Sequence, residues 1–252
     1  TFSLEELMTL YLCRGQLEFL QGTPFQDDLE AIFKRLRSSM PPRSVAHLER
    51  LAEASTPRFL GVKDYSGQYQ LLSDLRRALL KQQQIEIAYR PAKRKSETYR
   101  VDPYTLLFFK NALYLGGHAH NRQALRLFAI ERIESLQLLS ERFEVPDEYD
   151  ASALTGSAFG LIDDGALQRI ELLFDPEVAH LIRERTWHPQ QQLEQKDDGR
   201  LLLRFDAAGD KEILSWIYSF IPHVRVLAPE SLCQQFSDGL RHGLAFQQGV
   251  SP

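Results

Sequence analysis

The sequence predicts an α+β protein, and three observations support this class. Apolar residues recur with helical spacing over residues 3–54 and 71–84. The period then changes to two over residues 85–138, and strands alternate with helices beyond residue 166. The 252 residues therefore divide into a helical N-terminal connector (1–70), a small antiparallel β-barrel domain (71–142), a linker (143–165) and a C-terminal α/β domain (166–252).

Three helices are expected in the connector, and a fourth comes directly before the strands. Ser3 caps the first, because Glu6 follows three residues later as in a capping box. Thr23 is expected to cap the second, with Pro24 at its first helical position. Met40-Pro41-Pro42 ends that helix. The expected helices are 3–20, 24–40, 43–54 and 71–84.

Short strands joined by tight turns fill residues 85–138. Ile85-Glu86-Ile87-Ala88-Tyr89 alternates like a half-buried strand, and Lys110-Asn111 is the turn of a hairpin. The strand that begins at Thr98 is expected to stop at Pro103. Several short strands in about sixty residues indicate a small antiparallel barrel. The expected strands are 85–89, 98–101, 106–109, 112–117, 124–130 and 133–138.

The last part of the chain follows an acidic segment. Residues 141–165 are dotted with Pro, Gly, Ser and Ala, which is typical of a linker. Beyond it we expect strands at 169–174, 201–205 and 223–227, and helices at 176–186, 210–219 and 229–243. This alternation, with two helices packed on one sheet, predicts a ferredoxin-like α/β sandwich.

The charge of the chain is unevenly distributed. The formal net charge is −4, yet residues 86–132 hold nine basic and four acidic residues, a balance of +5. Residues 133–165 hold one basic and eight acidic residues, a balance of −7. The basic segment lies on the barrel strands and favours an anionic ligand. The alternative is a solvated strand surface, which the acidic segment could neutralise by folding back.

Several classes of protein are disfavoured by the sequence. No apolar run has the length of a membrane helix, and Thr1–Glu6 has no basic n-region of a signal peptide. Cys13 and Cys233 form no metal or disulfide pattern, so we expect a cytoplasmic protein without a membrane partner. The first residue is not methionine, which suggests a shortened chain.

Catalytic motifs are missing from the sequence. There is no P-loop, no G-x-G-x-x-G and no H-E-x-x-H, and we expect no enzyme activity and no cofactor. In His118-Ala119-His120 the two imidazoles lie on one side of a strand, but without a nearby cysteine or carboxylate they make a poor zinc site. We therefore predict no metal. A small-molecule enzyme using both histidines stays an alternative that needs a converging carboxylate, and Glu97 and Asp102 are the nearest.

Aromatic and basic side chains are concentrated on the barrel strands. Aromatic rings stack on bases and arginines hold phosphates in bidentate fashion, so such a set suits a nucleotide or a short single strand. Packing explains each tyrosine equally well. Ion pairs with Glu86, Asp102, Glu131 or Glu134 are the alternative for Arg100 and Arg132. The candidate ligand-binding residues are Tyr89, Arg100, Tyr114, His118, His120, Arg122, Arg126 and Arg132.

Two stretches of the barrel and one of the tail point to a family. The hairpin carries Leu113-Tyr114-Leu115-Gly116-Gly117-His118, and Arg126-Leu127-Phe128-Ala129-Ile130-Glu131-Arg132-Ile133 follows. The tail carries Trp187-His188-Pro189-Gln190. In this order the motifs resemble the WYL-domain family of bacterial transcriptional regulators, with Leu113 in place of the usual Trp. The tail is similar to the C-terminal extension that often follows the domain, and residues 4–36 to the connector after a winged helix.

The resemblance implies an Sm/SH3-like barrel that senses a nucleic-acid or nucleotide-like effector. It also implies a homodimer and a winged helix-turn-helix that binds operator DNA, which we expect to be absent from this chain. The implied pocket consists of Tyr114, His118, Arg126 and Arg132, with Arg100 and Tyr89 beside them. We therefore expect the ligand-sensing region of a transcriptional regulator. The alternative is a module that only dimerises or binds another protein.

Overall fold

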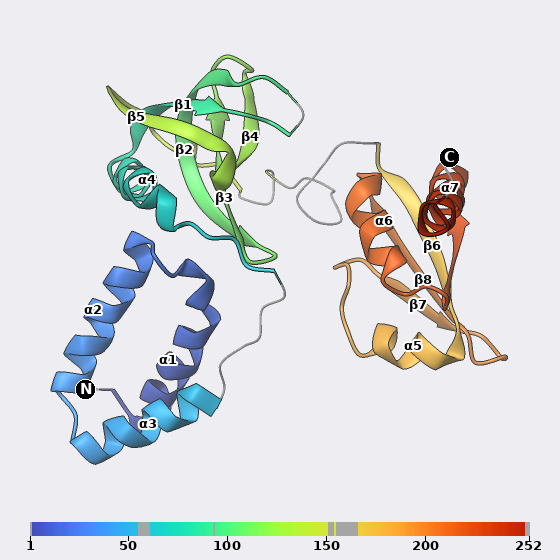
Figure 1. Ribbon diagram of the computed structural model, residues 1–252, viewed down its shortest axis with the longest axis horizontal. Helices are drawn as coiled ribbons and strands as arrows, with labels where there is room; N and C mark the ends of the chain where they lie inside the picture. The colour runs from blue at the N-terminus through green and yellow to red at the C-terminus, as the bar shows by residue number, and fades with distance from the viewer. Residues whose placement is uncertain (1, 55–60, 93, 151–153, 155–165, 250–252) are drawn as a thin grey trace. The chain divides into compact units, whose positions relative to one another are not determined.

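The computed structural model describes residues 2–54, 61–92, 94–150, 154 and 166–249, and it confirms the α+β class (Figure 1). The chain forms two compact units, Thr1–Asp150 and Ala151–Pro252, here called the N-terminal and C-terminal units. The finer division at residues 70, 142 and 165 stays a prediction. Residues 151–153 and 155–165 of the predicted linker lie outside the described part of the chain.

The N-terminal unit begins with three helices, α1 (Leu4–Gln16), α2 (Pro24–Ser38) and α3 (Pro42–Ala54). The capping box of α1 is confirmed, because the Glu6 amide donates to Ser3 Oγ at 3.2 Å and the Ser3 amide to Glu6 Oε2 at 2.6 Å. Thr23 is the N-cap residue of α2 with Pro24 at the first helical position, as predicted, but its hydroxyl donates to the Leu20 carbonyl at 2.6 Å instead of accepting from a helix amide. The three helices share a small core of Leu7, Tyr11, Phe33 and Leu48.

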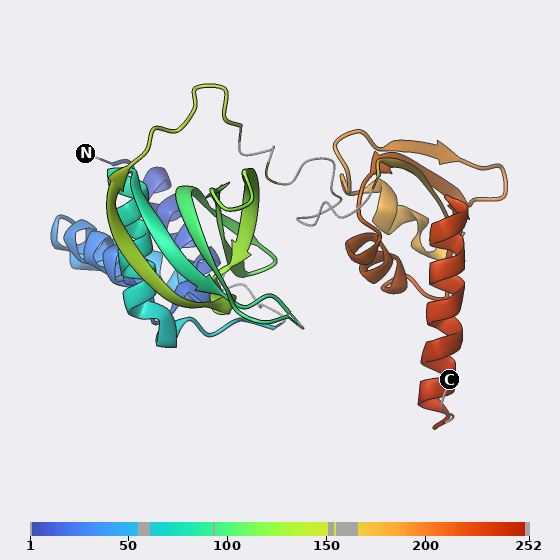
Figure 2. The ribbon, with the colours of Figure 1, turned by 90° about the horizontal axis from the view of Figure 1, so that it is seen from above.

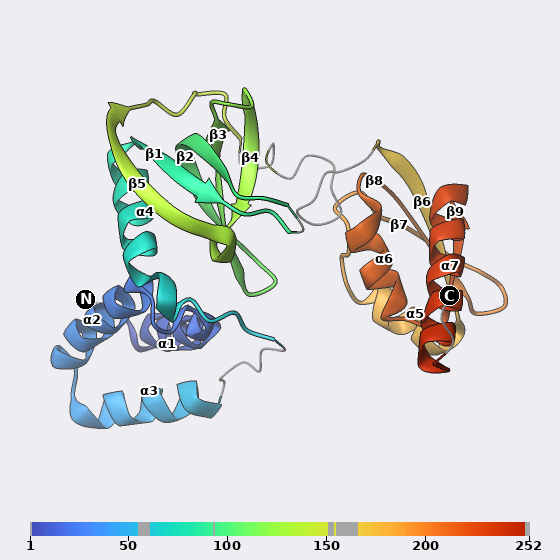
Figure 3. The ribbon, with the colours of Figure 1, turned by 45° about the horizontal axis from the view of Figure 1, so that its top comes forward.

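Five strands follow the helix α4 (Tyr69–Lys81) in a curved antiparallel sheet (Figure 3). They are β1 (Gln83–Tyr89), β2 (Glu97–Phe109), β3 (Ala112–Ala119), β4 (Ala124–Ala129) and β5 (Ile133–Arg142), in the order β4-β3-β2-β1-β5. Within the described residues no ladder joins β4 to β5, so the predicted barrel is not closed. The single turn Ile130–Arg132 carries the chain from the β3 side of the sheet to the β1 side.

The prediction of two separate strands, 98–101 and 106–109, on either side of Pro103 is wrong, because β2 is a single strand. It runs without interruption through that residue, and the register against β3 shifts between Pro103 and Thr105. A proline is tolerated in a strand at such a bulge, where the ladder does not require its missing N–H. The predicted turn Lys110-Asn111 is confirmed, with φ of 47° and 58° at its two residues.

One face of the curved sheet forms the main core of the N-terminal unit. Helix α4 packs against β1, β2 and β5 at this face (Figure 2). The other face carries the polar side chains considered below. The core includes Tyr65, Leu72, Leu75, Ile85, Ile87, Tyr89, Tyr99, Val101, Leu113, Leu115, Phe128 and Ile133.

Tyr65 links the segment before α4 to the sheet and gives a testable alkaline transition. Its hydroxyl accepts a hydrogen bond from the Leu113 amide at 2.8 Å, and burial raises its pKa to about 12. An unfolded tyrosine ionises near pH 10, so the free energy of unfolding should be intact below about pH 10 and fall by roughly 2–3 kcal/mol as the pH approaches 12. Tyr65→Phe should abolish this part of the fall.

The same substitution should cost about 1–3 kcal/mol at neutral pH, because it leaves the buried Leu113 amide without an acceptor. Denaturant unfolding of both proteins between pH 8 and alkaline pH measures the two effects, and the remaining tyrosines cancel in the difference. Parallel alkaline curves for wild type and Tyr65→Phe would contradict the assignment.

The C-terminal unit has a four-stranded antiparallel sheet in the order β7-β8-β6-β9. Its elements are β6 (Gln168–Phe174), α5 (Pro176–Arg183), β7 (Gln192–Gln195), β8 (Leu201–Ala207), α6 (Asp210–Tyr218), β9 (Val224–Ala228) and α7 (Glu230–Gln247). Strand β7 was not predicted from the sequence, because it is a short edge strand of mostly polar residues without alternation. None of the helices in the described ranges is long and apolar enough to cross a membrane.

Candidate functional site

The register of β3 shows that the predicted pocket residues do not share one side of the sheet. Directly opposed residues of antiparallel strands project to the same side. Tyr114 and His118 project away from the core, whereas Arg126 is opposed to Gly117 and lies on the side of Phe128. The set therefore divides into an outer group around His118 and an inner group around Arg126.

The outer group is a polar cluster on β2 and β3. Asp102 is directly opposed to His118, and the His120 amide continues the ladder by donating to the Arg100 carbonyl at 2.9 Å. The centroids of the two imidazole rings are 5.2 Å apart. One ligand atom from each of Asp102, His118 and His120 lies within 4.8 Å of the others. Asp102, one of the two carboxylates named from the sequence, thus converges on the histidines from the neighbouring strand.

Arg100 and Arg122 are held by hydrogen bonds and ion pairs. Arg100 Nη2 lies 3.3 Å from Glu141, and its Nε donates to Gln84 Oε1 at 2.9 Å. Arg122 Nη2 lies 2.7 Å from Glu97. Hydrogen bonds from Tyr99 and then from Arg122 hold the pKa of Glu97 below its ordinary value. Both guanidiniums therefore have carboxylate partners within the protein.

Tyr89 lies in the core instead of at a surface. Its ring packs edge-on against Phe128 and Tyr99, with centroids 5.1 and 6.3 Å away, and its hydroxyl accepts from the Ala129 amide at 3.4 Å. Packing, which the sequence left open for each tyrosine, accounts for this ring. Tyr114 is half-buried, and Lys63 Nζ lies 5.8 Å from its ring centroid.

Arg126 and Arg132 are exposed, and within the described residues neither has an ion-pair partner. The acidic residues nearest to Arg132 in sequence are engaged elsewhere. Glu131 pairs with Lys63, and Glu134 Oε1 lies 2.6 Å from Arg90. The ion-pair alternative for Arg132 is thus not formed with either neighbour, and the guanidiniums of Arg126 and Arg132 are available to an anion.

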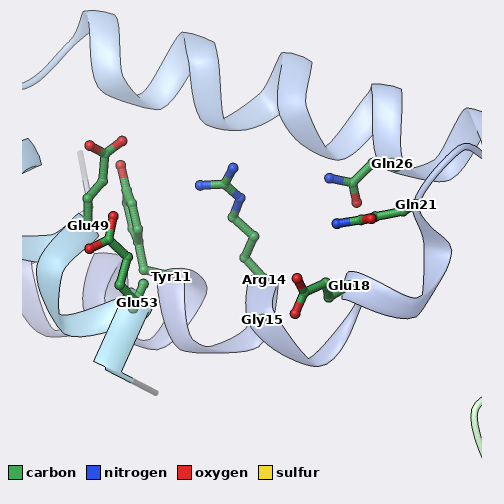
Figure 4. A pocket seen from close by; sticks show the side chains of 9 residues that line it. Tyr11, Arg14, Gly15, Glu18, Gln21, Gln26, Glu49 and Glu53 are labelled. Atoms are coloured by element: carbon green, nitrogen blue, oxygen red, sulfur yellow. The ribbon is translucent and has the colours of Figure 1, made fainter. Parts of the chain in front are cut away.

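A polar hollow of about 420 Å³ lies among the three N-terminal helices (Figure 4). It is lined by three carboxylates, Glu18, Glu49 and Glu53, and by Arg14, which is held 2.5 Å from Glu30. This excess of negative charge disfavours a phosphate. An anionic effector therefore fits the strands of the basic segment better than this hollow.

Two domain families match this chain, one within each of the two units. Residues 70–138 match the WYL domain, and residues 166–242 match the WCX domain. Protein PafC of Mycobacterium tuberculosis (strain CDC 1551 / Oshkosh) is 27% identical over 179 residues, which are 71% of this chain and 55% of that protein. Protein PafB of Mycobacterium leprae (strain TN) is 30% identical over 114 residues, 44% of this chain and 34% of that protein.

Two solved structures are also similar. Proteasome accessory factor B/C (PafBC) of Arthrobacter aurescens covers 97% of this chain with 36% of its own, at 18% identity and a TM-score of 0.39. A CRISPR Cas-related protein covers 82% of this chain with 62% of its own, at 13% identity and a TM-score of 0.50. The second likeness concerns the fold alone.

The chain contains a WYL domain followed by a WCX domain, in the order that the resemblance of its motifs to the WYL-domain family predicted. It spans about half the length of the M. tuberculosis relative. Leu113, which replaces the family's tryptophan, is fully buried in the core, so this departure affects packing and not a surface contact.

Proposed function

We propose that this chain is the ligand-sensing and dimerisation region of a transcriptional regulator, and that its WYL domain binds a nucleic-acid or nucleotide-like effector. In this proposal Arg126 and Arg132 hold phosphate. Tyr114 and His118 project from the other side of the sheet, so they contact the same effector where it passes around the edge strand β4. There Tyr114 stacks or donates a hydrogen bond, and His118 donates a second hydrogen bond. The role is regulatory and not catalytic.

One observation carries the proposal: Arg126 on β4 and Arg132 directly after it are exposed and without carboxylate partners among the described residues, a condition that Arg94 alone shares among the other arginines of the basic segment 86–132. Arg90, Arg100 and Arg122 of the same segment lie 2.6, 3.3 and 2.7 Å from a carboxylate. An exposed guanidinium without a carboxylate partner can hold the phosphate of an external ligand in bidentate fashion.

The test is a titration with short fluorescein-labelled single-stranded oligonucleotides at about 50 and about 200 mM salt, followed by anisotropy. Wild type should bind, with affinity that falls steeply with salt. Arg126→Ala with Arg132→Ala should weaken binding at least about tenfold. The slope of log affinity against log salt should become shallower by roughly 0.7 for each phosphate that the variant no longer neutralises.

The matched control is Arg90→Ala with Arg94→Ala, which removes the same charge from the same segment. It should retain most of the wild-type affinity, because Arg90 is paired with Glu134, and because Arg94 lies between β1 and β2, which are not adjacent to β4 in the sheet. No binding by wild type would refute the proposal. An equal decrease in affinity in both double variants would assign the effect to net charge and refute the two named arginines.

The proposal extends to partners and to the finer fold. We propose that the chain forms a homodimer, and that a winged helix-turn-helix attached to it binds operator DNA. The curved five-stranded sheet is interpreted as an open Sm/SH3-like barrel. The order β6-α5-β7-β8-α6-β9 with strands arranged β7-β8-β6-β9 is interpreted as ferredoxin-like.

A further inference from the structure

The cluster of Asp102, His118 and His120 on the outer face of the WYL sheet combines two imidazoles with a buried carboxylate. Asp102 is 7% exposed, and both histidines are half-buried. His120 Nε2 lies 2.9 Å from Asp102 Oδ1, yet that oxygen is buried and has no well-aligned hydrogen bond among the described residues. The two atoms are thus close together without a properly directed proton between them.

The neighbouring glutamine indicates which atom of His120 lacks a proton. Gln84 is 7% exposed, and its Oε1 accepts from Arg100 Nε at 2.9 Å. A guanidinium only donates, so the amide oxygen must face Arg100 and the amide nitrogen must face the other way. That nitrogen lies 3.3 Å from His120 Nε2 and directs a hydrogen towards it. Because the amide nitrogen can only donate, His120 Nε2 is the acceptor in this contact.

The carboxylate oxygen of Asp102 and the ring nitrogen of His120 are 2.9 Å apart, and both present lone pairs. Two such atoms repel each other at this distance, so a positive centre between them is required. Nitrogen and oxygen ligands lie at about 2.0–2.2 Å from zinc, which places neighbouring ligand atoms roughly 3 Å apart. The observed separation has this size. His118 supplies a third ligand atom within 4.8 Å of the other two.

We propose that Asp102, His118 and His120 bind a divalent first-row transition-metal ion of the zinc type. Imidazole nitrogens favour such an ion over calcium or magnesium, which prefer oxygen ligands. The ion replaces the long contact between Gln84 and His120. Three protein ligands leave a coordination position for water or for an anionic group, because the two histidines are open to solvent. Gln84 is a positioning residue that Arg100 orients.

The experiment uses the full chain after treatment with a chelator. Isothermal titration with zinc should give one bound ion per chain, and cobalt(II) should produce the visible absorption of a low-coordinate site. Asp102→Asn and His118→Asn should each weaken zinc binding at least about 100-fold. Gln84→Leu should weaken it by roughly 10-fold or more, as expected for a residue that orients a ligand. His47→Asn, which changes a histidine on α3, should bind as wild type does.

Thermal unfolding in chelator separates folding from binding. His118 is half-buried at the sheet surface, so its asparagine variant should melt near the wild-type temperature without metal. Added zinc should then raise the melting temperature of wild type but not of His118→Asn. Zinc uptake by His118→Asn equal to that of wild type, or no stoichiometric uptake by wild type, would overturn the proposal. The arginine variants that test effector binding should retain the metal, so the two proposals fail separately.

Discussion

Replacing Gly117 with alanine is expected to destabilise the N-terminal unit by about 3 kcal/mol or more, because the added carbon has no space. A Cβ at this position would lie 2.3 Å from the Asp102 carbonyl oxygen and 3.0 Å from Val101 Cγ1. The first obstacle is main chain in the middle of β2, next to the register shift at Pro103, so it cannot rotate away as a side chain would.

The matched control is Gly67→Ala. A Cβ on Gly67 meets nothing within 4 Å, and a change there should alter the free energy of unfolding by no more than about 0.5 kcal/mol. Denaturant unfolding of the three proteins measures both effects. Displacement of β2 would also move Asp102, so Gly117→Ala should lose zinc binding even where it stays folded. Equal unfolding midpoints for the two alanine variants would show that the main chain of β2 can move away at Asp102. That result would contradict the predicted loss of stability in Gly117→Ala.

The sequence predicts most helices and strands of this chain because their local signals agree with the fold. Residues close together in the sequence are enough to specify these elements. Examples are the helix start at Ser3 and Glu6, the strand around Ile87 with its period of two, and the hairpin turn at Lys110-Asn111. Pro103 misleads because the bulge that accommodates it depends on pairing with β3. β7 is missed because its four residues carry no apolar pattern.

The candidate site was predicted less completely, since it depends on cross-strand register. The sequence places Arg126 with Tyr114 and His118, but opposition to Gly117 puts it on the other side of the sheet. Asp102 is 16 positions before His118 and Gln84 is 36 before His120, so their convergence is visible only once the strands are paired. Asp102 and Gln84 are buried although they are polar. A polar residue within a predicted strand is the signal in the sequence that could have pointed to them, because a buried polar group needs a partner.

Phe128→Ala is expected to cost about 3–5 kcal/mol, because it removes the ring that joins the edge strand β4 to the core. Phe128 is 2% exposed, and its ring meets Tyr89 and Tyr99 at centroid distances of 5.1 and 5.2 Å. Strand β4 pairs only with β3 within the described residues, so little else holds it. Phe128→Leu keeps much of the volume and should restore more than half of the lost stability.

The consequence for function follows from the position of Arg126, two residues before Phe128 on the same side of β4. If β4 loosens, Arg126 is no longer fixed, so Phe128→Ala should weaken oligonucleotide binding while Phe128→Leu should bind nearly as wild type does. Phe108→Ala is the control: this ring on β2 is 51% exposed, and its removal should cost about 1 kcal/mol or less and leave binding intact. Denaturant unfolding and anisotropy on the same preparations give both readouts. Full oligonucleotide affinity in a folded Phe128→Ala protein would show that the order of β4 does not govern the effector site, and the phosphate contact would then have to be assigned to Arg132 alone.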